Sequence, residues 1–346
     1  MKQRVAIYGA GAMGTVLGAF LTAGGQEVDL ISRNAAHIEG LQKYGARIEC
    51  TATEKEFTVP VKAFAPEEMQ GKYDVIFLMT KQRENVKTLE FLKEFLSEDG
   101  VVCTTQNGLP EESVASVLGY EKTYGAAVTF GARFIGGGKA ALTSMPAAMS
   151  MRVGGYFNDN SKTERLVEIL SAGKKLSGNE NFVSATDNLA GARWSKLAVN
   201  AAFSGLSVVT GLTFGEIAKK RKTKKIALGI LREAITAARA LGVEIEKMQG
   251  YKLEQLFGKG NFFQNAKANF LLPIAMKSHS MLRSGMLADV QKGRKCEIDF
   301  IDGMVAKMAK KAGVEAPLCE KVVEIVHGIE NGLYEISYEN MDFFEN

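Results

Sequence analysis

Histidine and cysteine are scarce in this sequence. Its 346 residues include three histidines, His37, His279 and His327, and four cysteines that lie far apart and form no Cys-x-x-Cys motif. This supply offers little material for a zinc cluster, a disulfide framework or a histidine-based triad. We therefore expect no metal, four reduced thiols, and acid–base chemistry by a side chain other than histidine.

Long uncharged segments are rare as well. Residues 5–26 carry no charge and follow Lys2 and Arg4, as a signal peptide or a membrane span would, but six of them are glycine. A membrane span or a signal peptide would be rich in leucine instead. We expect a cytoplasmic protein with no membrane partner.

The sequence also lacks a large excess of charge of one sign. The formal net charge is +4, and the one dense basic run, residues 219–225, has no interleaved aromatic residues. We interpret this run as a solvated helix end or a turn between helices, and we expect no nucleic-acid partner.

What the first half does contain is an alternation of strand-like and helix-like segments. The strand-like runs are 5–8, 27–31, 75–79, 101–105 and 123–130. They predict an α/β domain with a mostly parallel sheet. Residues 45–61 alternate like an antiparallel hairpin attached to that sheet, and residues 148–153 read as another strand. From residue 187 the periodicity is helical, so we expect an α/β domain, residues 1–186, followed by an all-helical domain, residues 187–346.

Three glycines form a G-x-G-x-x-G motif between the first strand and an alanine- and leucine-rich helical stretch. In that context the motif is typical of a Rossmann-type dinucleotide-binding domain. Gly9 permits the tight turn, Gly11 lets the backbone approach the pyrophosphate, and Gly14 lets the helix pack on the strand. The amides at the start of the helix, where Ala12 and Met13 lie, would bind the phosphates.

The end of the second strand distinguishes two cofactors. An NAD site usually has an acidic residue there, whereas an NADP site has a small hydroxyl residue and an arginine for the 2′-phosphate. The strand ends in Ser32, Arg33 and Asn34, and Asp29 lies three residues too early. We predict NADP(H), bound by Ser32 and Arg33; the alternative is that Arg33 is only a solvated residue.

Two polar residues follow the third and fourth main strands. Lys81 and Asn107 fall at carboxyl ends of parallel strands, where open α/β sheets bind their ligands. Lys81 could hold a cofactor phosphate or a substrate acid, and Asn107 could orient the nicotinamide ribose or the substrate. The alternatives are a solvated loop lysine and an Asn-Gly turn.

The first helix expected in the second domain, residues 190–204, is apolar nearly all round but carries a polar stripe. The stripe residues recur at spacings of 3, 4, 4 and 3, and they are Arg193, Lys196, Asn200, Ser204 and Ser207. A polar stripe on a buried helix must face polar groups, either a ligand or an interhelical ion pair. Burial would suit Lys196 to donate a proton near neutral pH.

Residues 295–308 predict another helix with a carboxylate, Glu297, in its first turn. Its buried face is expected at Ile298, Ile301, Val305 and Met308. The helix dipole favours a carboxylate there even without a function. Together, the Lys196 ammonium and the Glu297 carboxylate could lie on either side of a substrate carbonyl group while it is reduced.

In combination and in order, these motifs resemble the ketopantoate reductase family (2-dehydropantoate 2-reductases) over nearly the whole chain. The shared phrases are Gly9-x-Gly11-x-x-Gly14, Thr-Lys81, Gln-Asn107-Gly, Trp-x-Lys196-x-x-x-Asn200 and Gly293-Arg294-x-x-Glu297-Ile-Asp. The resemblance implies a Rossmann-type domain followed by a helical domain, with the site in the cleft.

The resemblance also implies roles for individual residues. Lys196 would be the general acid toward the ketone oxygen, and Glu297 would contact the substrate beside it. Asn107 and Asn200 would bind substrate. Arg33 and Lys81 match positions that hold NADPH.

Two departures from the family pattern affect the substrate. Ser204 stands where the family often has a second asparagine, one turn after Asn200. The position of the serine that the family has ahead of Glu297 is ambiguous in this sequence. Counting back from Glu297 without gaps places Gly285 there, next to Ser284, whereas the segment that matches the family's serine better contains Ser280, five residues earlier. Ser204, Ser280 and Ser284 are therefore candidate substrate-binding residues.

The preferred interpretation is an NADPH-dependent reduction of 2-dehydropantoate to pantoate, a step toward coenzyme A. One alternative is a reductase of a bulkier 2-oxo acid, which Ser204 and the altered serine region favour. Another is a non-catalytic NADP-binding sensor, which would not need Lys196 and Glu297. The expected partner is thus a small 2-oxo acid; the oligomeric state stays open, with a homodimer as one option.

Overall fold

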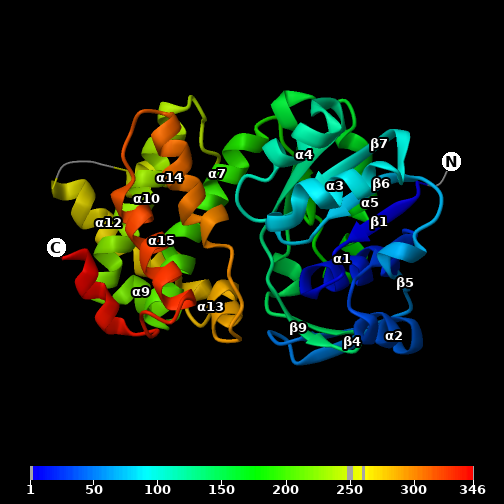
Figure 1. Ribbon diagram of the computed structural model, residues 1–346, viewed down its shortest axis with the longest axis horizontal. Helices are drawn as coiled ribbons and strands as arrows, with labels where there is room; N and C mark the ends of the chain where they lie inside the picture. The colour runs from blue at the N-terminus through cyan, green and yellow to red at the C-terminus, as the bar shows by residue number, and fades with distance from the viewer. Residues whose placement is uncertain (1–2, 248–251, 259–261, 346) are drawn as a thin grey trace. The chain divides into compact units, whose positions relative to one another are not determined.

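The computed structural model describes residues 3–247, 252–258 and 262–345, and the chain packs into two units (Figure 1). The α/β unit comprises Met1–Gln106 and Pro110–Leu189. The helical unit comprises Asn107–Leu109 and Ala190–Asn346. The change of character expected near residue 187 is thus a change from one packed unit to the next at residue 190, and one short segment of the first half belongs by its packing to the second unit.

The α/β unit contains strands and helices in alternation. Its strands are β1 Val5–Tyr8, β2 Val28–Ile31, β3 Ala46–Cys50, β4 Lys55–Val59, β5 Lys62–Phe64, β6 Tyr73–Leu78, β7 Leu96–Thr104, β8 Thr123–Val128, β9 Ala132–Gly136, β10 Lys139–Leu142, β11 Met151–Gly155 and β12 Val183–Ala185. Its helices are α1 Ala12–Ala23, α2 Ala35–Tyr44, α3 Asn85–Lys93, α4 Glu111–Leu118, α5 Thr163–Ser171 and α6 Lys174–Ser177.

The main sheet has eight strands among the described residues, in the order β12-β11-β8-β7-β6-β1-β2-β5. Every neighbouring pair is parallel except β8 and β11. Side chains of one face, such as Ile7 and Phe77, pack in a core with α1 and α5, and those of the other face, such as Ala6 and Leu78, pack with α3 and α4. The α/β prediction, with helices on both faces of a mostly parallel sheet, is confirmed (Figure 1).

The hairpin predicted within residues 45–61 exists, but its attachment to the main sheet is wrong. β3 and β4 pair antiparallel, and β3 pairs in parallel with β10, giving a second sheet of order β4-β3-β10-β9. Helix α1 contacts strands of both sheets. Alternation along the chain predicts a strand but does not reveal a partner that lies about ninety residues away.

The strand predicted at residues 148–153 begins later than expected. β11 starts at Met151, and Pro146–Ala148 form a short 3-10 turn before it. Proline fixes its own φ and donates no backbone hydrogen bond, so it favours the turn over the ladder.

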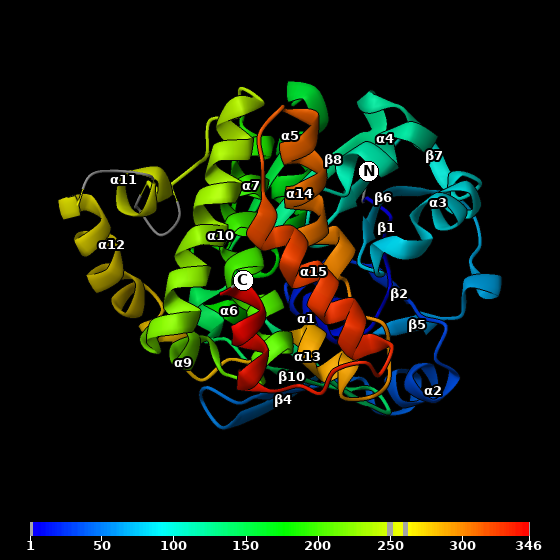
Figure 2. The ribbon, with the colours of Figure 1, turned by 60° about the vertical axis from the view of Figure 1, so that its left-hand side comes forward.

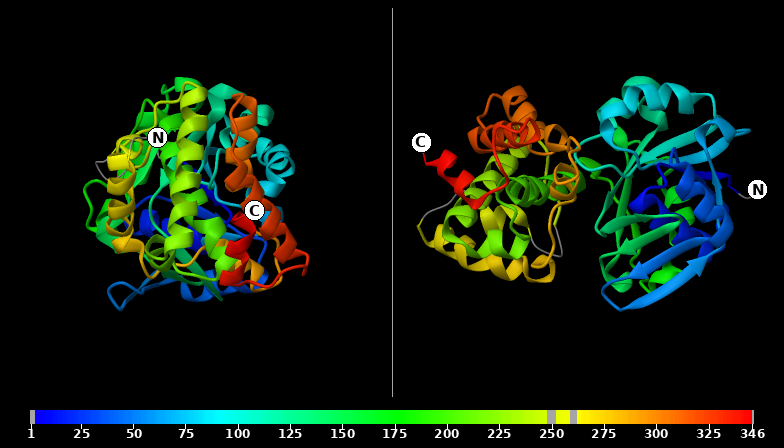
Figure 3. Two further views of the ribbon diagram at one scale, coloured as in Figure 1. Left: turned by 90° about the vertical axis from the view of Figure 1, so that its left-hand side faces the viewer. Right: turned by 60° about the horizontal axis from the view of Figure 1, so that its bottom comes forward.

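The described residues of the helical unit, 190–247, 252–258 and 262–345, contain no strand, as predicted. Its helices, with α7 starting one residue before the unit, are α7 Leu189–Asn200, α8 Leu206–Thr210, α9 Phe214–Lys219, α10 Arg221–Ala240, α11 Leu253–Phe257, α12 Phe262–Ala275, α13 Gly285–Val290, α14 Asp302–Lys311 and α15 Pro317–Glu330. The long helix α10 packs against α14 and α15, and Figures 2 and 3 show these helices side by side. None of the described helices combines the length and the hydropathy that crossing a membrane requires.

The basic run at residues 219–225 joins two helices. Lys219 ends α9, Lys220 has an extended backbone conformation, and Arg221 begins α10. Both interpretations from the sequence, a helix end and a turn between helices, describe parts of this run: Lys219 and Arg221 are helix ends, and Lys220 lies in the turn between them.

Candidate functional site

The three glycines of the G-x-G-x-x-G motif lie in the turn between β1 and α1. Gly9 has a φ of +108°, and a Cβ there would stand 2.6 Å from the backbone nitrogen of Thr80. A Cβ at Gly14 would clash with the carbonyl oxygen of Gly9. Gly11 differs, because no atom lies within 4 Å of the place where its Cβ would stand. Two glycines thus hold the turn together, and the third borders open space.

The N-terminus of α1 begins at this open space. Gly11 is the N-cap, no side chain of the described residues caps the helix, and the first turn holds no acidic residue. The first amides of the helix, including those of Ala12 and Met13, have no intrahelical acceptor, and the helix dipole favours an anion beside them. This arrangement fits the pyrophosphate of a dinucleotide.

A buried histidine that was not among the candidate site residues supports the glycine turn. His37 Nδ1 accepts from the N–H of Gly138 (3.1 Å), so Nε2 carries the proton and donates to Thr15 Oγ1 (2.9 Å). Thr15 Oγ1 donates in turn to the carbonyl oxygen of Ala10 (3.4 Å). Burial lowers the pKa of His37 to about 4, so the side chain stays neutral at physiological pH. The partner Gly138 lies 101 residues away, which no local pattern indicates.

The end of β2 places the predicted cofactor-selecting residues at the surface. Arg33 is exposed, and Ser32 Oγ accepts from the N–H of Asn34 (3.2 Å). Asp29 accepts from the hydroxyl of Tyr73 (2.8 Å) and pairs with Arg4 (3.5 Å). Since Asp29 already has these partners, it is a poor candidate for holding a ribose diol, and Arg33 remains the group suited to a 2′-phosphate.

The loops after β6 and β7, which carry Lys81 and Asn107, are tied to each other by a buried amide network. Gln106 Nε2 donates to the carbonyl oxygen of Thr80 (2.7 Å) and to Asn85 Oδ1 (2.7 Å). Asn85 Nδ2 donates back to Gln106 Oε1 (3.1 Å). The network fixes the residue before Lys81 and the residue before Asn107, so both predicted residues start from rigid positions. Lys81 is exposed.

Helix α7 carries two of the predicted polar residues in a buried setting. Arg193 is 2% exposed, and Lys196, one turn later, is partly buried. Burial, and then the charge of Arg193, lower the pKa of Lys196 to about 7, against the opposing effect of Glu297. Lys196 is therefore close to half protonated at neutral pH, the state that suits a proton donor. The electrostatic effect of Glu297 on Lys196 also means that the structure brings these two predicted residues near each other.

The polar stripe continues through a π-helical segment, Ala201–Gly205, that joins α7 to α8. Ser204 Oγ donates to Asn200 Oδ1 at 2.5 Å. Ser207, which the sequence placed on the same stripe, instead donates to the carbonyl oxygen of Leu212 (2.8 Å). π segments are frequent at functional sites, and this one keeps Asn200 and Ser204 together.

The helix predicted from residue 295 starts later, so the position of Glu297 in a first α-helical turn is wrong. Glu297 precedes the 3-10 turn Ile298–Phe300, and α14 begins at Asp302. Ile301 breaks the helical path with φ −115° and ψ −89°. The expected buried face is also partly shifted.

On that face, Ile298, Ile301 and Val305 are buried as predicted, but Ala309 takes the place expected for Met308, which is only partly buried. A periodicity extrapolated across a break predicts the wrong buried face, because the break changes the rotation per residue and so turns the later residues toward another side.

The three candidate serines have different surroundings. Ser284 is the N-cap of α13, accepts from the N–H of Met286 (3.1 Å), and donates its own N–H to Ser207 Oγ (3.3 Å). Ser280 packs against Gly215 of α9, whose N–H donates to the Ser280 carbonyl oxygen (3.0 Å). Ser284 thus lies beside the end of the α7–α8 segment, while Ser280 lies beside α9. Gly285 is exposed, and nothing lies within 4 Å of the place of its Cβ.

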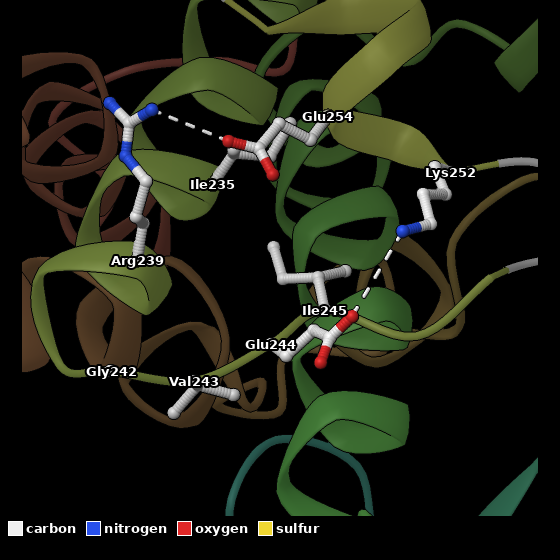
Figure 4. Close-up of a pocket in the computed structure, with 8 residues that line it drawn as sticks. All are labelled: Ile235, Arg239, Gly242, Val243, Glu244, Ile245, Lys252 and Glu254. Atoms are coloured by element: carbon white, nitrogen blue, oxygen red, sulfur yellow. Dashed lines mark hydrogen bonds and ion pairs between the residues drawn. The ribbon is translucent and has the colours of Figure 1, made fainter.

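A pocket lies at the end of α10 and the start of α11, and its lining includes Ile235, Arg239 and Lys252 (Figure 4). Its charged side chains pair with one another, Arg239 with Glu254 (3.3 Å) and Lys252 with Glu244 (4.0 Å). The sequence-predicted residues do not line it.

Comparison with known proteins adds a family. Residues 5–153 match the family described as "Ketopantoate reductase PanE/ApbA", and residues 188–330 match "Ketopantoate reductase PanE/ApbA C terminal". A 2-dehydropantoate 2-reductase of Archaeoglobus fulgidus is 24% identical over 345 residues, which span 96% of this chain and 99% of that protein.

Solved structures share the fold over nearly their whole length. A D-mandelate dehydrogenase in a ternary structure with NADH and anilino(oxo)acetate is 23% identical, with a TM-score of 0.79 over 95% of this chain and 99% of that one. A dimeric ketopantoate reductase from Staphylococcus aureus is 16% identical, with a TM-score of 0.70 over 95% of this chain and 99% of that one.

Proposed function

The chain belongs to the ketopantoate reductase family and is a nicotinamide-dependent oxidoreductase, and from this premise we propose that it reduces 2-dehydropantoate to pantoate with NADPH. The observation that carries the proposal is Lys196, held partly buried on α7 with its pKa lowered to about 7 and under the influence of Glu297. A sensor that only binds a dinucleotide would need neither residue.

Lys196 supplies the proton in the proposed reaction. NADPH, when bound, would supply the hydride to the carbonyl carbon, and the Lys196 ammonium would donate the proton that turns the ketone oxygen into a hydroxyl. The nearby charge of Arg193 favours the neutral amine that remains, and Glu297 favours the ammonium that must be restored. The two opposing charges therefore keep the lysine able both to give up and to regain its proton near neutral pH.

Asn200 is proposed to bind the substrate through its amide nitrogen. Because Ser204 donates to Asn200 Oδ1, the amide is oriented with Nδ2 as its donor. A donor of this kind suits the carboxylate of a 2-oxo acid. In the α/β unit, Arg33 and Ser32 are proposed to hold the 2′-phosphate and Lys81 another phosphate or the substrate acid. Asn107, which packs with the helical unit, is proposed to orient the nicotinamide ribose or the substrate.

A second candidate is a bulkier 2-oxo acid. Gly285 offers open space where an ungapped count puts the family's serine, and Ser284 is engaged as the cap of α13. The similar D-mandelate dehydrogenase supports the idea that a family scaffold can accept an aromatic substrate.

The test is a panel of 2-oxo acids, each followed by the loss of NADPH absorbance. We expect 2-dehydropantoate to have the highest kcat/KM, and kcat to fall as the pH rises above about 7, because Lys196 must be protonated to act. A clear preference for an aromatic 2-oxo acid would support the second candidate instead. Absence of turnover with every acid would contradict both.

Two serine variants separate the candidates further. If Ser280 contacts the substrate carboxylate, Ser280→Ala should raise the KM for 2-dehydropantoate about tenfold, the effect of one hydrogen bond to a charged group. If the pocket is instead open at Gly285, Ser280→Ala should leave the KM for 2-dehydropantoate nearly unchanged, and Gly285→Ser should lower that KM.

The oligomeric state is proposed by analogy with the dimeric Staphylococcus aureus enzyme. Sedimentation analysis of this 37.5 kDa chain should give the mass of a homodimer. A single species at the mass of one chain would contradict that proposal.

A further inference from the structure

The short segment that carries Glu297 is held on both sides by helix α15. On one side of Glu297, the N–H of Cys296 donates to Glu330 Oε1 (2.7 Å). On the other side, Asp299 Oδ1 lies 2.8 Å from His327 Nε2. Within α15, His327 Nδ1 lies 3.1 Å from Glu330 Oε2. The three contacts close a ring through α15 and residues 296–299, and Glu297 lies inside that segment.

The chemistry of the ring requires a protonated histidine. Both nitrogens of His327 face carboxylates, and an ionised carboxylate can only accept hydrogen bonds. Both nitrogens must therefore donate, which only the imidazolium form can do. A neutral imidazole would leave one nitrogen lone pair directed at a carboxylate oxygen.

The charges around His327 favour the imidazolium. Burial alone would lower the pKa of His327, but its bonds to Glu330 and Asp299 outweigh that effect and raise the pKa above the ordinary 6.5. The side chain of Glu330 is 4% exposed, so its negative charge depends on nearby donors. Lys321 and Glu324, earlier on α15, pair with each other at 2.7 Å.

Cys296 contributes to the ring through its contact with Glu330. Its thiol is buried, and burial and then the hydrogen bond with Glu330 raise the pKa of Cys296 to about 12. The thiol therefore stays neutral across the working range of pH. Among the described residues, the charged groups that act on the pKa of His327 are Glu330 from its own helix and Asp299 from the 3-10 turn.

We propose that His327, in its imidazolium form, is a positioning residue that clamps residues 296–299 to α15 and so fixes Glu297 relative to Lys196. When His327 loses its second proton, one of its two carboxylate bonds is lost and the segment loosens. The role in catalysis rests on the proposed function, because it matters only if Glu297 contacts the substrate. The clamp itself does not rest on it.

The sign of the pH effect follows from this ring. The clamp is complete at pH values below the raised pKa of His327 and weakens as the pH rises through it. Since Glu297 is proposed to contact the 2-oxo acid, the clamp should affect the KM for that acid. The KM for NADPH should not change, because the glycine turn, Ser32 and Arg33, which are proposed to bind the dinucleotide phosphates, lie in the α/β unit.

The first experiment measures the KM for 2-dehydropantoate at pH 6 and pH 8.5 in the wild type, His327→Gln and His327→Arg. The wild-type KM should rise about tenfold between the two pH values, the scale of a lost charge-assisted hydrogen bond. His327→Gln has a single donor nitrogen and should show the high KM at both. His327→Arg keeps a permanent cation with several donors, so it should keep a low KM at both. Glu324→Gln, on the same helix outside the ring, should behave as the wild type.

The second experiment follows the protein itself without turnover. Since the sequence has three histidines, their ring resonances can be titrated by NMR, and His327 should titrate above 6.5 in the wild type and lower in Glu330→Gln. The protection factors of the amides of residues 296–299, which correct the exchange rates for the intrinsic effect of pH, should fall through that titration, but not in His327→Arg.

The outcomes separate the clamp from the proposed reaction. Three outcomes would overturn the clamp: a His327 titration at or below 6.5, protection factors at residues 296–299 that stay constant through the titration, or a Glu324→Gln variant that behaves like His327→Gln. If no 2-oxo acid is reduced while exchange still follows the titration, the proposed function fails and the clamp stands.

Discussion

The two units present their candidate ligand-binding groups in different ways. In the α/β unit the groups are mainly backbone amides at the start of α1, placed by Gly9 and Gly14, which leave no room for a Cβ. In the helical unit they are side chains, Lys196, Asn200 and Glu297, and their properties depend on what surrounds them. A backbone site is specified by a few adjacent residues, whereas a side-chain site also needs its neighbours in space. The following variants test that difference, in order of decreasing expected effect.

Replacing the lysine should have the largest effect. We expect Lys196→Ala to lower kcat by roughly 10² to 10⁴, the range for a positioned general acid, and to leave NADPH binding nearly unchanged. Steady-state kinetics and a dinucleotide titration measure the two properties. Lys225→Ala, at an exposed lysine of α10, is the control. A near-normal kcat at neutral pH would mean that the proton comes from another group.

Removing the proposed phosphate-binding arginine should act on one cofactor only. We expect Arg33→Ala to raise the KM for NADPH by about 10- to 100-fold, because a hydrogen bond to a charged group is lost, and to change the KM for NADH little. Kinetics with each cofactor at saturating 2-oxo acid measure both values. Equal effects on the two cofactors would remove Arg33 from the 2′-phosphate site.

Two glycine variants should separate folding from cofactor binding. Gly9→Ala places a Cβ against Thr80 in a left-handed backbone conformation, so it should cost about 1–3 kcal/mol of stability. Gly11→Ala points its Cβ into open space, so it should keep the melting temperature and raise the KM for NADPH. Thermal unfolding and kinetics of both variants measure the contrast. If Gly11→Ala destabilises as much as Gly9→Ala, the space at Gly11 is not a binding site.

A buried carboxyl in the helical unit should give the smallest effect. Asp302 is fully buried, and apart from its own backbone N–H no described group hydrogen-bonds its carboxyl oxygens. Burial raises the pKa of Asp302 well above its ordinary value, so its ionisation favours unfolding, and stability falls as the pH rises toward that raised pKa.

We therefore expect Asp302→Asn to melt higher than the wild type at pH 8 and to lose less stability between pH 5 and pH 8. Thermal unfolding across that range is the measurement. Glu315→Gln, at an exposed position of the same unit, should follow the wild type. If Asp302→Asn shows the wild-type pH dependence, the pKa of Asp302 in the folded protein is not raised into this range.

By itself, the sequence determined the fold class, the order of the main strands along the chain, the helical second half and the glycine turn. It did so because a strand period, a helix period and a glycine motif are local properties of adjacent residues. The candidate residues of α7 could also be predicted, since a polar stripe on an apolar helix is visible in the spacing of Lys196 and Asn200.

Only the tertiary structure decided the rest. It gave β3 the partner β10, placed Glu297 before a 3-10 turn instead of in an α-helix, and put His37 and His327 among partners from distant segments. It also brought Glu297 close enough to affect the pKa of Lys196. These properties come from desolvation and from contacts between residues far apart in the chain, and neither is written in a short stretch of sequence.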